Sequence, residues 1–79
     1  KRYDLILSFQ SWCFHYPPAV YLESILQACH KDTVVIVDLR EDRPFWSLVL
    51  RERFKSTQVI LRRPKYQRIV MKGALHVSF

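Results

Sequence analysis

One histidine, His15, lies in a stretch near the N-terminus that is rich in aromatic side chains, namely Phe9, Trp12, Phe14 and Tyr16. Aromatic walls around a titratable imidazole suit an organic substrate, because histidine can accept a proton near neutral pH. The sequence therefore makes His15 a candidate catalytic base, with Trp12 and Tyr16 as candidate substrate-binding residues. The alternative is that the rings pack under a helix and the imidazole bonds to a backbone carbonyl.

A carboxylate, Asp38, comes directly after the apolar run Val34–Val37. Ligands of open α/β sheets bind beyond the carboxyl ends of the parallel strands, so Asp38 is a third candidate substrate-binding residue. The same carboxylate could instead pair with Arg40 or cap the helix that follows.

The cysteines and histidines do not have the spacing of a metal site. Cys13 and Cys29 are 16 positions apart without a CxxC pair, and His15, His30 and His76 show no zinc-ligand pattern. We therefore predict no metal. Cys13 has no evident partner that would activate it as a nucleophile. Two thiols that need not meet fit a reducing cytoplasm, which is the expected location.

The single glycine, Gly73, excludes several classes of nucleotide site. It lies near the end of the chain, so no glycine-rich turn can cradle a phosphate or a dinucleotide. A complete Rossmann-type cofactor site, a P-loop and a kinase glycine-rich loop are all excluded within this chain.

The apolar patterns predict strands near residues 4–9 and 33–38, helices near 18–30 and 44–54, and two final strands near 57–62 and 67–72. Pro18 suits the first helical position, where a backbone N–H has no partner. The run Val34–Val37 is apolar at every position, which is typical of a strand covered by helices on both faces. We therefore expect it to be the most buried segment. The fold class is α/β, in the order β-α-β-α-β-β, with two parallel strands and a C-terminal antiparallel hairpin.

The length of 79 residues fits one domain over residues 1–79. The longest uninterrupted apolar run, Val34–Val37, is far short of the roughly 20 residues that span a bilayer, and no signal peptide is evident. Because the chain starts Lys1-Arg2-Tyr3 without a methionine, we expect a processed product or an excised piece.

The charge is concentrated in the second half of the chain, where residues 40–79 carry ten basic and three acidic residues. The densest basic stretch spans the predicted hairpin turn and contains Arg62, Arg63, Lys65, Tyr66 and Arg68. Cations around an aromatic ring could contact nucleic-acid phosphates and stack on a base. The alternative is a solvated edge strand whose charges deter pairing with other chains.

The first strand, Tyr3-Asp4-Leu5-Ile6-Leu7-Ser8, resembles the (F/Y)DLI-x-S fourth strand of class I S-adenosylmethionine-dependent methyltransferases. The helix, strand, helix and hairpin that follow are in the order of the C-terminal half of that family. Ser11–Pro17 resembles a loop of bacterial sugar O-methyltransferases, and Pro64-Lys65-Tyr66 is also similar to that group. The resemblance covers roughly residues 3–73 and implies a partial Rossmann-like methyltransferase sheet.

The resemblance also implies roles for individual residues. Ser8, Phe9 and Gln10 would lie near the methionine end of the cofactor, and His15 and Tyr16 near the acceptor hydroxyl. The family's glycine-rich loop and the acidic residue after its second strand have no counterpart here, so this chain alone is expected to be inactive.

The resemblance further implies an unpaired edge along residues 4–9, which pairs in the family with the first strand of the missing half. We expect this edge to be covered by that N-terminal half, by a second copy or by another protein.

The leading hypothesis is therefore a fragment of an enzyme that transfers a methyl group to the hydroxyl of a small molecule such as a sugar, with His15 as the base. The first alternative is a small basic α/β module that binds nucleic acid through Arg62, Arg63, Lys65 and Arg68. The second alternative is a structural or interaction half-domain without activity. No membrane partner is expected.

Overall fold

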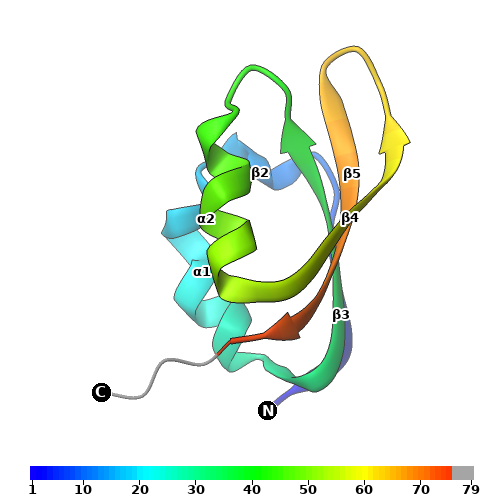
Figure 1. Ribbon diagram of the computed structural model, residues 1–79. Coiled ribbons are helices and arrows are strands. Elements are labelled where there is room, and N and C mark those ends of the chain that lie inside the picture. Colours follow the sequence, from blue (N-terminus) through cyan, green and yellow to red (C-terminus); the bar gives the residue numbers. More distant parts are fainter. Residues whose placement is uncertain (76–79) are drawn as a thin grey trace.

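The described part of the computed structural model, residues 1–75, is a four-stranded sheet with both helices on one of its faces (Figure 1). In chain order the elements are β1 (Tyr3–Ser8), β2 (Ser11–Tyr16), α1 (Pro18–Gln27), β3 (Cys29–Arg40), α2 (Phe45–Arg53), β4 (Phe54–Arg62) and β5 (Tyr66–Ala74).

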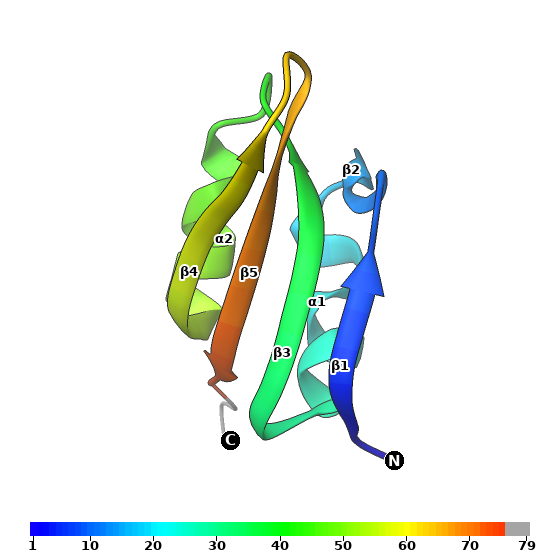
Figure 2. The ribbon, with the colours of Figure 1, turned by 90° about the vertical axis from the view of Figure 1, so that its right-hand side faces the viewer.

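The strand order in the sheet is β1-β3-β5-β4. β1 and β3 run parallel, as predicted, while β5 is antiparallel to both of its neighbours, β3 and β4. β4 and β5 form the predicted antiparallel hairpin around residues 63–65. The small α/β class with a mixed sheet is therefore confirmed, and β1 and β4 are the two edge strands (Figure 2).

The two helices begin close to their predicted starts and bury their apolar sides against the sheet. α1 starts with Pro18 and buries Leu22 and Leu26, which are four residues apart and therefore lie on the same side of the helix. α2 buries Leu50. In the described part of the chain, neither helix is long and apolar enough to cross a membrane.

An ion pair links the two helices at the molecular surface. Arg53 of α2 donates a hydrogen bond from one of its terminal nitrogens to Glu23 Oε1 of α1, over 2.8 Å. This hydrogen bond holds the pKa of the Glu23 carboxyl below its ordinary value. The pair is solvent-exposed at Glu23, so it orients the helices more than it stabilises them.

The central strand, β3, is buried on only one face. Val35 and Val37 have no exposed surface, as predicted, but Val34 and Ile36 are only half-buried. The expectation that helices cover both faces was wrong, because α1 and α2 pack on the same side of the sheet (Figure 2). Successive side chains of a strand point to opposite faces, so Val34 and Ile36 lie on the open face.

Several element bounds differ from the sequence prediction, and β3 and β4 begin at Cys29 and Phe54, earlier than the predicted residues 33 and 57. The loop expected after the first strand contains β2, which lies outside the four-stranded sheet and packs against β3. The alternation of buried and exposed residues that marks a strand is interrupted in β2, because Cys13 has a positive φ of 69° and the neighbours Trp12 and Cys13 are both buried. This interruption made β2 hard to recognise from the sequence. The first helix ends at Gln27 rather than near residue 30, because Cys29 already pairs with Tyr3 in the sheet.

The open face of the sheet carries exposed apolar side chains along β1. Leu5 and Leu7 are 53% and 51% exposed, and they pair with Val34 and Ile36. Residues that are directly opposite in a sheet share a face, so these side chains form one apolar strip beside the free edge of β1.

We predict that Gly73→Ala destabilises the fold by about 1–3 kcal/mol, the typical strain of a left-handed non-glycine residue. Gly73 has a φ of +70°, and an added Cβ would lie 2.8 Å from Lys55 Cβ on the neighbouring strand. Thermal unfolding measures the loss. Ser56→Ala, an exposed change on the same strand pair, should leave the midpoint nearly unchanged, and equal effects of the two changes would contradict the prediction.

Candidate functional site

The segment that joins β1 to β2 is held at the carboxyl ends of β1 and β3. The hydroxyl of Ser8 accepts a hydrogen bond from the Trp12 backbone N–H at 3.0 Å, and the Gln10 backbone N–H donates to Asp38 Oδ2 at 3.0 Å. Gln10 itself has a positive φ of 51°, which reverses the chain between the two strands. The predicted cofactor-binding residues Ser8 and Gln10 therefore already use these polar groups within the protein.

The carboxylate of Asp38 is fully buried and is held by Arg68 of β5. Arg68 donates from Nε to Oδ1 at 2.7 Å and from a terminal nitrogen to Oδ2 at 3.1 Å. This two-point contact is the strong form of the arginine–carboxylate pair, and it raises the pKa of Arg68. Asp38 therefore neither pairs with Arg40 nor caps α2, because Arg40 pairs with Asp42 instead.

The ring of Phe9 lies over the Arg68 guanidinium, whose carbon is 4.0 Å from the ring centroid. Arg68 is directly opposite Asp38 in the β3–β5 ladder, and residues that are directly opposite share a face. This cation–π contact therefore lies on the same face as Asp38, which is the open face of the sheet. Phe9 is still 45% exposed, so the part of the ring that is not against Arg68 remains available to a ligand.

Two residues of β2, Trp12 and Cys13, belong to the hydrophobic core. Trp12 is 3% exposed, and its indole N–H donates to the Pro18 carbonyl oxygen at 2.9 Å. This placement favours the packing role for Trp12 over a direct contact with substrate. Burial raises the pKa of the Cys13 thiol, which keeps it protonated and unreactive. Cys13 and Cys29 are both free thiols.

His15 is exposed and faces a hollow of about 460 Å³. Its imidazole stands edge-on to Phe14, with ring centroids 4.8 Å apart. Among residues 1–75, no side chain or backbone group forms a hydrogen bond with this imidazole, so both of its nitrogens are available to a ligand. The other residues that line the hollow are Phe14, Arg40, Glu41, Asp42, Pro64 and Lys65.

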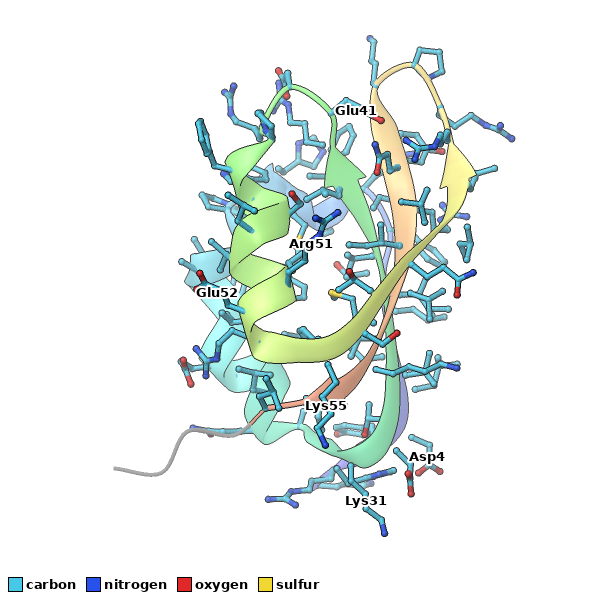
Figure 3. The ribbon with its side chains drawn as sticks, in the orientation of Figure 1. Asp4, Lys31, Glu41, Arg51, Glu52 and Lys55 are labelled. Atoms are coloured by element: carbon cyan, nitrogen blue, oxygen red, sulfur yellow. The ribbon has the colours of Figure 1, made fainter. Side chains whose placement is uncertain are left out.

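Three chain segments meet at this hollow: β2, the turn after β3 and the β4–β5 hairpin tip. Glu41 lies on the turn after β3 (Figure 3), and its backbone N–H donates to the Lys65 carbonyl oxygen at 3.1 Å. The segment after the central strand, which contains Glu41, was expected at the same edge of the sheet as the His15 loop. No sequence signal indicated that Lys65 would join them, because its proximity depends on which strand lies beside β3.

The remaining candidates lie apart from this hollow. Tyr16 is exposed and does not line it; its ring makes an edge contact with Tyr21 of α1 at a centroid distance of 5.8 Å. His76 lies outside the described residues. Within residues 1–75, no three His, Cys, Asp or Glu side chains gather in a way that could hold a metal ion.

Comparisons with protein-family models, curated proteins and solved structures found no match. The functional interpretation of this chain therefore depends on the geometry around His15 and on the arrangement of the sheet.

We predict that Asp38→Asn lowers the thermal midpoint several times more than Asp42→Asn does. Asp38 has no exposed surface, whereas the Asp42 side chain is 58% exposed, and exposed ion pairs contribute about 0–1 kcal/mol.

Arg68→Gln provides a further check. It should lower the midpoint as Asp38→Asn does, and the double variant should lose less than the sum of the two, because both changes remove one interaction. Strictly additive losses would contradict the prediction, because they would show that the two side chains do not stabilise the fold through their contact with each other.

Proposed function

We propose that this chain is the C-terminal half of a class I S-adenosylmethionine-dependent methyltransferase that methylates a hydroxyl group of a small molecule such as a sugar. The observation that carries the proposal is the position of His15. Its imidazole has no hydrogen-bond partner in the described chain and faces a hollow at the carboxyl end of the parallel strand β3, and ligands of open α/β sheets bind beyond the carboxyl ends of parallel strands. The order of the parallel strands, the helices and the closing hairpin along the chain also supports the proposal, because it is the order that the resemblance to the methyltransferase family implies.

In this proposal His15 acts as the proton acceptor. The cofactor supplies an activated methyl group, and the acceptor hydroxyl loses its proton to the imidazole as its oxygen is methylated. A general base must lie about 2.6–3.2 Å from the group that it deprotonates, and the unpartnered imidazole leaves room for such a contact. Glu41 and Lys65, which line the same hollow, would hydrogen-bond other hydroxyl groups of the acceptor.

The residues of this chain do not form a complete cofactor pocket. Ser8 and the backbone N–H of Gln10 are hydrogen-bonded within the protein, and the oxygens of Asp38 are used by Arg68 and Gln10. Of the three predicted cofactor-binding residues, the exposed part of Phe9 and the exposed side chain of Gln10 are free to border a cofactor. The groups that hold the cofactor must therefore come from another polypeptide segment.

We infer that this segment is the N-terminal half of the same methyltransferase domain, added as a strand along β1. β1 is an edge strand of the sheet, and Leu5 and Leu7 form an exposed apolar strip beside it. An unpaired, apolar edge of this kind favours the addition of a further strand. The same segment would supply the cofactor pocket that this chain lacks, which favours it over a second copy of the chain.

In the complete protein, we expect His15→Ala to lower the turnover number by about 100-fold or more, the lower end of the usual contribution of a general base. The matched control is His30→Ala. His30 lies in β3 at the opposite end of the sheet, where its Nε2 is 2.6 Å from Asp4 Oδ1, so its loss should leave turnover within about threefold. If both changes lower the turnover number to a similar extent, the role of His15 is structural and not catalytic.

We expect isothermal titration calorimetry to show S-adenosylmethionine binding to the complete protein and none to residues 1–79 alone. Sedimentation and amide exchange of the isolated chain test independently whether the edge strand β1 is unpaired. Fast exchange at Leu5–Ser8 that slows when the N-terminal half is added would support the proposal. A stable monomer with slow exchange along β1, or a dimer that pairs through β1, would contradict it.

A further inference from the structure

A second hollow, of about 250 Å³, also borders the turn that follows β3. Four of the residues that line it are arginines from four different places: Arg40 at the end of β3, Arg43 before α2, Arg51 in α2 and Arg62 at the end of β4. We refer to it as the arginine hollow. It shares Arg40 and Glu41 with the hollow beside His15, but His15 does not line it.

The positive charge of the arginine hollow is only partly neutralised. Arg40 Nε is 2.6 Å from Asp42 Oδ1, and Arg43 is 3.8 Å from the other oxygen of the same carboxylate. Among residues 1–75, Glu41 is the one acidic residue that lines the hollow. Four guanidinium groups thus share two nearby carboxylates, which leaves a formal excess of two positive charges.

Arg51 and Arg62 carry most of this excess. Within residues 1–75, neither guanidinium forms an ion pair or a hydrogen bond with another residue. Arg51 extends from α2 toward the strands, whereas its neighbour Glu52 points to the opposite side of the helix (Figure 3). Like charges at close range repel each other. An anionic ligand that binds among these arginines would offset their repulsion, so the arrangement favours such a ligand.

The size and lining of the arginine hollow indicate a small ligand. Its volume is several times the roughly 30 Å³ of a water molecule but below the range of about 300–1,000 Å³ that is typical of pockets for drug-sized ligands. Leu39 and Val59 contribute apolar surface, and Ser47 and Gln67 contribute hydrogen-bonding groups. Guanidinium groups bind phosphate oxygens through paired N–H donors.

A nucleic-acid strand fits this surface less well. Arg68 is held by Asp38, and the ring of Tyr66 is half-buried and makes an edge contact with Phe14 at 6.0 Å. The basic stretch therefore offers neither the aromatic platform nor the full row of free cations that binding of a single strand uses. Arg62 belongs to the arginine hollow instead, apart from the hairpin tip formed by Arg63 and Lys65.

We propose that the arginine hollow binds the phosphate group of a small phosphorylated molecule, with Arg51 and Arg62 as its main contacts. The site is independent of the methyltransferase proposal, because none of its evidence involves His15 or a cofactor.

Calorimetric titration of the chain of residues 1–79 with inorganic phosphate and with glucose 6-phosphate, at constant ionic strength, tests this proposal. Saturable binding with a Kd of about 1 mM or lower is the expected result. Arg51→Gln and Arg62→Gln should each weaken it by about tenfold or more. Lys55→Gln is the matched control, because Lys55 is an exposed cation of β4 at the far end of the molecule (Figure 3).

Two outcomes would overturn the proposal. The first is the absence of saturable phosphate binding, or binding that all three variants weaken equally, which would indicate only general attraction to a basic surface. The second is a preference for a short single-stranded RNA over both phosphates, with Arg63→Gln weakening RNA binding more than Arg62→Gln does. That result would identify the hairpin tip as a nucleic-acid contact. Neither phosphate binding nor RNA binding requires catalysis. These measurements therefore test the proposal whether or not the protein transfers methyl groups.

Discussion

The buried carboxylate of Asp38 is the constraint on which the rest of this structure depends. It joins three separate segments of the chain. Asp38 lies in β3, and its carboxylate accepts two hydrogen bonds from Arg68 of β5 and a third from the Gln10 backbone N–H. A buried charge without partners is strongly unfavourable, so all three segments must be in place together. The pair thereby couples the β3–β5 register to the conformation of the chain after β1.

This coupling determines which groups meet at the carboxyl ends of the parallel strands. With β5 fixed beside β3, the tip of the β4–β5 hairpin lies next to the turn formed by Arg40, Glu41 and Asp42. That turn borders two hollows of different character, one lined by His15 and the other by the four arginines, and Arg40 and Glu41 line both. One end of the sheet therefore brings an exposed imidazole and a group of arginines close together.

The two faces of the sheet differ in what covers them. One face packs against α1 and α2 and contains the fully buried side chains of Val35, Val37 and Met71. The other carries the apolar strip of Leu5 and Leu7 beside the free edge of β1. A chain of this size buries only about 60% of its unfolded surface, so covering this strip would add substantially to stability.

The sequence by itself determined the elements whose signals are local: the helix that starts at Pro18, the parallel pair around it and the closing hairpin. It also made His15 a candidate, because an imidazole among aromatic residues is visible within one short segment. Only the tertiary structure decided that Asp38 pairs with Arg68, which is 30 positions away in the chain, and that one face of β3 remains open. The physical reason is that local propensity is encoded in neighbouring residues, whereas cross-strand register and helix placement depend on contacts between distant segments.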